Sequence, residues 1–159
     1  MNGIKRILVV SRSTKDCKKA VHYGISLAKQ NKAKLYVLHV FDDPFGLEAW
    51  SLPVVSWKEI QEEYKRMQEK TRIGIDMIIE GEQSTGMPIE VSLEDGHPAE
   101  KILSFVKENK IDLLIMLAHE EGRLEYLLFG HSIDKIVRKL PCSVLLVKQE
   151  PGPADEESG

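Results

Sequence analysis

The sequence predicts an α/β fold in which helices cover both faces of one parallel sheet. Short apolar runs typical of buried strands alternate with longer segments whose apolar residues recur at helical spacing, in the order βαβαβαβαβ. Such alternation gives a parallel sheet with right-handed crossovers. The chain has 159 residues and no evident internal repeat, so we expect a single domain with a proper hydrophobic core.

The composition narrows the classes of function. Apolar residues make up 42% and charged residues 30% of the chain, which is ordinary for a soluble protein. The formal net charge of −3 gives no electrostatic case for nucleic acid. No apolar run approaches the ~20 residues of a membrane span, and the N-terminus lacks the cleavage site of a signal peptide. The two cysteines, Cys17 and Cys142, form no CxxC pair, so we expect reduced thiols in a cytoplasmic protein.

The first part of the chain is expected to supply two strands and a helix. Arg6–Val10 is a β-branched run that predicts a buried strand. Thr14 is a plausible N-cap for a helix whose apolar face consists of small residues, including Gly24, which would let it pack close to the sheet. Leu35–Phe41 is the second strand.

A long irregular connection, Phe41–Val55, follows the second strand. Two interpretations stay open: a loop folded onto its own domain, or a lid or partner-binding patch, because exposed apolar clusters tend to be interaction sites. Its large apolar side chains are Phe45, Leu47, Trp50, Leu52 and Val54.

A capping box at Ser56 and Glu59 predicts the start of a long amphipathic helix that runs to about Glu80. We expect the aromatic residues of this helix to pack in the core. The predicted apolar face consists of Trp57, Ile60, Tyr64, Met67, Thr71, Ile75 and Ile78.

The second half of the chain completes the alternation. Pro88–Glu94 alternates apolar residues with polar ones, two of them glutamates, which suits a protected sheet edge. Pro98 stands at the first position of a third helix. An apolar strand at Leu113–Leu117 leads through a polar loop into a helix that ends at Leu140–Pro141, and Val144–Val147 is the last strand.

Several short motifs recur in order along the chain. They are Ile7-Leu8-Val9 through Thr14, Ala20, Tyr23, Leu27 and Ala28; Leu38-His39-Val40; Gly96-His97-Pro98-Ala99-Glu100; and Pro141-Cys142-Ser143-Val144-Leu145-Leu146-Val147. With this spacing the chain resembles the universal stress protein family, which implies one domain over residues 1–148. Gln149–Gly159 has no apolar anchor and is expected to be a disordered acidic tail.

The resemblance implies a Rossmann-like, doubly wound sheet in the order 3-2-1-4-5 with four main helices. It also implies a nucleotide-binding-like cleft between the first and fourth strands, where the strand order reverses. The residues expected near this cleft are Ser11, Arg12, Val40, Leu117, His119, Glu120, Gly122, Gly130, His131 and Ser132.

Members of the family that bind ATP carry G-x2-G-x9-G-[S/T] after the fourth strand, where glycines let backbone N–H groups approach the phosphates. Anchored on Gly130, the first two glycines fall on Leu117 and Glu120, and His131 stands at the hydroxyl position. The family's aspartate at the end of the first strand is Arg12 here. This degenerate motif favours a member with no cofactor, and ATP binding through an atypical loop is the alternative.

The altered cleft has two interpretations. Arg12 would either pair with Glu120 or Glu121 and close the pocket, or join nearby cations in holding a different anion. His119, His131 and Cys142 have no spacing typical of structural zinc, so no metal site is predicted.

No arrangement typical of catalysis is evident in the sequence. There is no Ser-His-Asp order, no paired carboxylates and no P-loop, so an enzyme has little support. We interpret His39, within the second strand, as a satisfied core residue, and His22 as solvated.

The fifth strand would be an edge of the sheet that is apolar on both faces and carries no charge before Lys148. An unguarded edge of this kind needs a cover, and a two-fold partner would supply one. Many members of the family dimerise through the last strand. We therefore predict a homodimer through Val144, Leu145, Leu146 and Val147.

These observations favour a non-catalytic, homodimeric universal stress protein that acts in the stress response through protein partners or an unidentified small ligand. The alternative is a nucleotide-binding member, acting as an ATP/AMP switch or a slow ATPase. A third interpretation is a domain of a larger assembly that docks through the loop 41–55.

Overall fold

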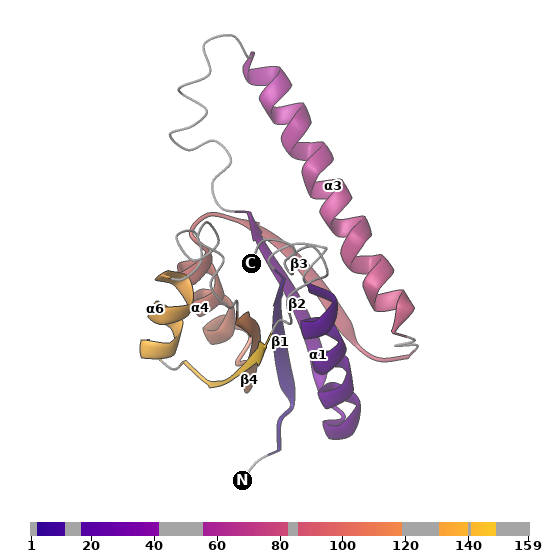
Figure 1. Ribbon diagram of the computed structural model, residues 1–159, viewed down its shortest axis with the longest axis vertical. Helices are drawn as coiled ribbons and strands as arrows, with labels where there is room; N and C mark the ends of the chain where they lie inside the picture. Colours follow the sequence, from indigo (N-terminus) through magenta and orange to yellow (C-terminus); the bar gives the residue numbers. More distant parts are fainter. Residues whose placement is uncertain are drawn as a thin grey trace, which may run out of the picture.

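The computed structural model describes residues 3–11, 17–41, 56–82, 86–118, 131–139 and 141–148. They form one five-stranded sheet in the order β3-β2-β1-β4-β5, with helices on both of its faces (Figure 1). The predicted doubly wound α/β architecture and its strand order are therefore confirmed. None of the helices in the described ranges is long and apolar enough to cross a membrane.

The strands are β1 (Arg6–Ser11), β2 (Lys34–Phe41), β3 (Ile89–Asp95), β4 (Leu113–Ala118) and β5 (Ser143–Lys148). Every neighbouring pair runs parallel. The central strand β1 places Val9 opposite Val37 of β2 on one side and Ile115 of β4 on the other. Strands buried on both faces read as continuous apolar runs, which explains why the sequence marks them so clearly.

The helices are α1 (Cys17–Asn31), α3 (Trp57–Gly81), α4 (Pro98–Glu108) and α6 (His131–Lys139). In Figure 1, α1 and α3 cover one face of the sheet, and α4 and α6 cover the other. Each face has its own core, so Val9 packs on the α1 side and Leu8 on the α4 side.

Helix α1 lies close to the sheet, as its small residues predict. A Cβ atom added at Gly24 would come within 2.4 Å of Val9 Cγ2 and 3.1 Å of Leu35 Cδ1. A larger residue would force helix and sheet apart. The predicted N-cap of this helix, Thr14, lies outside the described residues.

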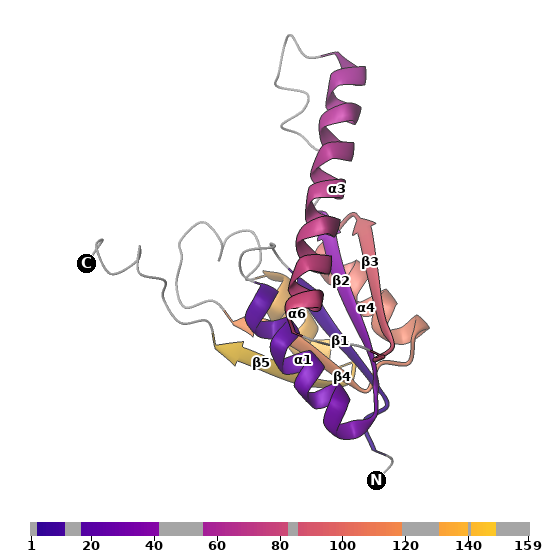
Figure 2. The ribbon, with the colours of Figure 1, turned by 90° about the vertical axis from the view of Figure 1, so that its right-hand side faces the viewer.

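Helix α3 begins where its capping box predicts. The Ser56 hydroxyl accepts a hydrogen bond from the backbone N–H of Glu59, and the Glu59 carboxylate accepts one from the backbone N–H of Ser56, both at 3.3 Å. The prediction that its aromatic residues pack in the core is wrong for Trp57, whose exposed fraction is 61%. The helix has 25 residues and is longer than the strands it crosses, so its N-terminal end projects past the sheet (Figure 2).

The two edges of the sheet differ in charge. On β3, Glu90 pairs with Lys34 at 2.9 Å, and Glu94 pairs with Lys101 at 3.9 Å. The predicted charged edge is therefore present. On β5, Val147 is buried while Leu146 is 44% exposed, so this edge presents apolar surface.

Candidate functional site

The candidate site lies at the carboxyl ends of β1 and β4, the neighbouring strands at which the strand order reverses. In open α/β sheets this is where ligands bind, because the connections from the two strands leave toward opposite faces. The described residues form the floor of this site. The segments that follow β1, β2 and β4, residues 12–16, 42–55 and 119–130, lie outside them.

Three of the predicted cleft residues lie on this floor, at the ends of three different strands. Ser11, Val40 and Leu117 have exposed fractions of 2%, 8% and 1%. Leu117 packs in the core on the α1 side, whereas Val40 packs in the core on the α4 side. Leu117 and Val40 therefore pack on opposite faces of the sheet, which the sequence analysis did not predict.

The remaining predicted residues belong to the connection after β4 or to the start of the next helix. His131 and Ser132 are the first two residues of α6, as the predicted loop-to-helix order requires. Those that lie outside the described residues are Arg12, His119, Glu120, Gly122 and Gly130.

Ser11 and His39 form a buried polar pair on the floor. They lie opposite each other in the register of β1 and β2, and Ser11 Oγ is 3.3 Å from His39 Nδ1. Burial lowers the pKa of the His39 imidazole, and a hydrogen bond with Ser11 acts in the opposite direction. The imidazole is therefore neutral at pH 7, and the interpretation of His39 as a satisfied core residue is confirmed.

An aromatic contact chain continues from His39 along the α1 side of the sheet. The His39 ring lies 4.6 Å from the ring of Phe41, the last residue of β2. The Phe41 ring lies 5.7 Å from that of Tyr64 in α3. Edge-to-face contacts of this kind hold the rings in fixed relative positions. The end of β2 is thus joined to the first half of α3.

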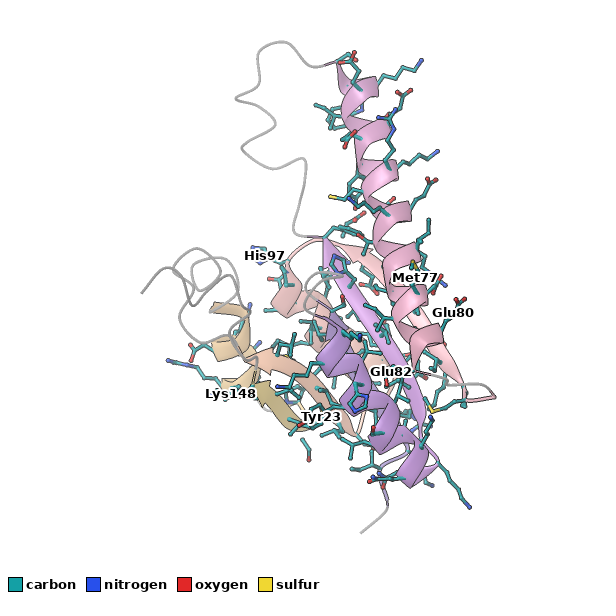
Figure 3. All side chains as sticks on the ribbon, turned by 45° about the vertical axis from the view of Figure 1, so that its right-hand side comes forward. Tyr23, Met77, Glu80, Glu82, His97 and Lys148 are labelled. Atoms are coloured by element: carbon teal, nitrogen blue, oxygen red, sulfur yellow. The ribbon has the colours of Figure 1, made fainter. Side chains whose placement is uncertain are left out.

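Two other titratable side chains, His22 and Cys142, lie away from this floor. His22 of α1 is exposed, and its Nδ1 is 2.7 Å from Glu82 Oε2, so it is paired as well as solvated. Figure 3 shows Glu82 beside α1, near Tyr23. The Cys142 thiol lies against the core on the α4 side, and burial raises its pKa, which makes it a poor nucleophile.

Metal-ligating side chains do not cluster in the part of the chain that the structure describes. No group of three or more His, Cys, Asp or Glu residues could hold an ion there. The described floor has an apolar surface and one neutral hydroxyl–imidazole pair, Ser11 and His39. This pair suits hydrogen bonding to a ligand rather than neutralisation of a ligand's charge.

Comparison with known proteins places the chain among related sequences. A family model described as "Universal stress protein family" matches residues 3–148. Universal stress protein MJ0531 of Methanocaldococcus jannaschii is 28% identical over 150 residues, which cover 93% of this chain and 84% of the relative. A universal stress protein of Thermus aquaticus is 28% identical over 152 residues, covering 91% of this chain and 98% of the relative.

Solved structures share the fold at lower identity. Hypothetical protein MJ0577 superposes with a TM-score of 0.70 at 19% identity, covering 94% of this chain and 99% of that one. UspA from Lactobacillus plantarum gives 0.65 at 17% identity, covering 92% and 99%. A universal stress protein family protein from Arabidopsis thaliana, solved with AMP bound, gives 0.62 at 19% identity, covering 95% and 99%.

Burial of the His39 imidazole should make the stability of the folded protein depend on pH. Burial lowers the pKa of His39 in the folded protein. Below pH 6.5, the ordinary pKa of histidine, the unfolded chain therefore binds a proton at this residue more readily than the folded protein does. The free energy of unfolding should therefore fall as the pH drops below 6.5, with a contribution of at most about 1.4 kcal/mol per pH unit.

Urea unfolding at a series of pH values would measure this contribution. His39→Leu should flatten the dependence between pH 6.5 and 5, while His97→Gln, which removes an exposed imidazole at the start of α4, should leave it in place. Equal slopes for His39→Leu and the natural protein would contradict the assignment.

Proposed function

The chain belongs to the universal stress protein family, and from this premise we propose that it acts in the stress response without catalysing a reaction. In this proposal it is a cytoplasmic homodimer of the branch that does not bind ATP. It consists of one domain over residues 1–148 and an acidic tail. It works through protein partners or through an unidentified small ligand in the cleft.

The observation that carries the proposal is the position of Leu117. In the family's phosphate-binding motif a glycine stands at this point, but here the side chain is 1% exposed and belongs to the core on the α1 side. Glycine permits close approach of the backbone to phosphates, and leucine removes that freedom. Glu120 stands at the second glycine of the motif, where a carboxylate opposes phosphate binding, and Arg12 stands where the family has an aspartate at the end of the first strand.

Dimerisation through β5 is supported by the contrast between the two edges. The charged pairs on β3 oppose pairing with another sheet, and β5 carries no such charges before Lys148. A second copy related by a two-fold axis would place β5 against β5 and extend the sheet across both chains. The exposed Leu146 would then be covered by the partner.

Nucleotide binding is the competing function. Two structural relatives favour it, one solved with AMP bound and one solved in complex with cAMP. In this chain Gly130 precedes the N-terminus of α6, and Ser132 would supply a hydroxyl one position later than the motif has it. A helix N-terminus with a preceding glycine is a suitable phosphate site.

Calorimetric titration with ATP and magnesium, and separately with AMP, would distinguish the two functions. We expect no binding heat up to millimolar nucleotide, because Leu117 and Glu120 replace the glycines that let backbone N–H groups approach the phosphates. Micromolar binding that Gly130→Val abolishes would replace this proposal with the nucleotide-binding alternative.

Substitution of the exposed strand residue would test the dimer interface. Leu146→Lys places a charge on the open edge and should convert the dimer to monomer or insoluble protein in light scattering. The matched control is Ile73→Lys, which changes a residue of 59% exposed fraction on α3 and should leave a dimer. Val144→Lys is less informative because Val144 packs against the core. A dimer that survives Leu146→Lys would exclude this interface.

A further inference from the structure

Helices α1 and α4, which lie on opposite faces of the sheet (Figure 1), end in the same way. Both ends carry the sequence Lys-x-Asn-Lys followed by an apolar residue. The second lysine of each, Lys32 or Lys110, has a left-handed backbone, with φ of 53° and 50°. The next residue, Ala33 or Ile111, donates a backbone hydrogen bond to the carbonyl five residues earlier, at 2.9 and 3.0 Å. The two helices therefore share one C-terminal cap geometry.

The left-handed lysines are not explained by the caps themselves. Glycine is the usual residue at this position, because a Cβ atom strains a left-handed backbone. The last-turn carbonyls already have side-chain donors, since the amides of Asn31 and Asn109 donate to them at 2.8 and 3.1 Å. The helix dipoles already have cations, since Lys29 and Lys107 stand in the last turns. A role outside the helix caps is therefore needed to account for lysine at both positions.

The two caps meet at the amino end of the sheet, on either side of β1. Arg6, the first residue of β1, stands opposite Lys34 of β2, and its carbonyl accepts a hydrogen bond from the Asp112 N–H at 2.9 Å. Lys32 and Lys110 each precede one of these two neighbours of β1 by two residues. Because adjacent strands lie about 4.8 Å apart, the two neighbours are about 10 Å from each other. The connections that carry the left-handed lysines thus flank the start of β1.

Cationic side chains gather on this surface, which we call the basic end. Five of its six cationic residues are exposed and one, Arg6, is half-buried. None of the six forms an ion pair or a side-chain hydrogen bond with any residue that the structure describes. The basic end is defined by Lys5, Arg6, Lys29, Lys32, Lys107 and Lys110.

Carboxylates near the basic end offset only part of its charge. Glu108 is exposed between the two lysines that close α4. The Asp112 carboxylate accepts hydrogen bonds from two backbone N–H groups at the start of β1, each at 2.9 Å. Glu90 of β3 is engaged by Lys34 at 2.9 Å. The basic end therefore keeps an excess of positive charge, although the formal net charge of the whole chain is −3.

A short acidic peptide suits this surface better than a nucleic acid or a membrane does. Charges more than about 8 Å away are screened at physiological ionic strength, so a short ligand senses mainly the local cations. A long polyanion or a bilayer would also meet the negative remainder of the chain. Residues 3–6, 29–34 and 107–112 expose no large apolar side chain that could anchor in a bilayer or stack on a base.

We propose that the basic end binds a short acidic segment of a partner protein. The carboxylates of that segment lie among the lysines of the two caps, at the opposite end of the sheet from the ligand cleft. Lysine is retained at both left-handed positions because the bound carboxylates require cations there. The inference deepens the proposed action through protein partners by naming the charge of the segment that is recognised. It does not depend on what occupies the cleft.

Fluorescence anisotropy with a fluorescein-labelled octaglutamate peptide would test the proposal. The natural protein should bind the peptide, and the affinity should fall as sodium chloride is raised, because exposed ion pairs are screened. Lys32→Gly combined with Lys110→Gly should weaken binding about five-fold, since two exposed ion pairs are lost. The urea midpoint of this variant should stay the same or rise, because glycine relieves the left-handed strain. Weaker binding therefore cannot be attributed to unfolding.

The matched control is Lys18→Gln combined with Lys70→Gln. It removes the same charge from exposed positions at the other end of α1 and on α3, and should leave the peptide affinity unchanged. Absence of salt-dependent peptide binding, or an equal loss in the two variants, would overturn the proposal. So would tighter binding of an eight-nucleotide single-stranded DNA or of phosphatidylserine vesicles. A lower urea midpoint for the glycine variant would instead assign the lysines to the stability of the caps, against the proposal. The separate nucleotide titration tests the proposed function, so the two failures are distinguishable.

Discussion

Strand β1 has to satisfy hydrogen bonds with a neighbour on each side while its side chains fill a core on each face. Its register with β4 is held at the start of the strand, where the Asp112 carboxylate accepts hydrogen bonds from the backbone N–H groups of Lys5 and Arg6, each at 2.9 Å. The backbone N–H of Asp112 donates to the Arg6 carbonyl, also at 2.9 Å. The strand order reverses between β1 and β4, and Ser11, the last residue of β1, lies on the floor of the site there.

The alternation of apolar runs and helical periodicity was sufficient to predict a parallel α/β sheet, whereas the strand order followed from the resemblance to the universal stress protein family. Strands buried on both faces, such as Leu113–Ala118, leave an unambiguous pattern, and the capping box at Ser56 marks the start of α3. Periodicity shows which side of a helix is apolar but not where the sheet beneath it ends. For that reason Trp57 was placed in the core although it is 61% exposed.

The candidate site was only partly predictable for a related reason. The contact between Ser11 and His39 depends on the register of two strands separated by a helix, which no local pattern specifies. Val40 and Leu117 pack on opposite faces of the sheet because side chains alternate between the two faces along a strand. Which residue packs on which face is known only from the two cores of the structure. Arg12 and Glu120, on which the ATP argument depends, lie outside the described residues.

In the proposed account, two features distinguish this chain from an ATP-binding relative. Leu117 packs in the core at the position where the family's ATP-binding motif has a glycine, and β5 presents an apolar edge. In this account these features replace a phosphate-binding loop with a surface for association. The second copy of the chain would then be recognised through apolar contact rather than through nucleotide-dependent switching.

Native mass spectrometry of freshly purified, undialysed protein would test this account most directly, because it reports oligomeric state and bound ligand together. The account predicts a species of twice the 18.0 kDa chain mass, with no added mass of an adenine nucleotide. A monomer, or a species carrying the mass of ATP or AMP, would contradict it.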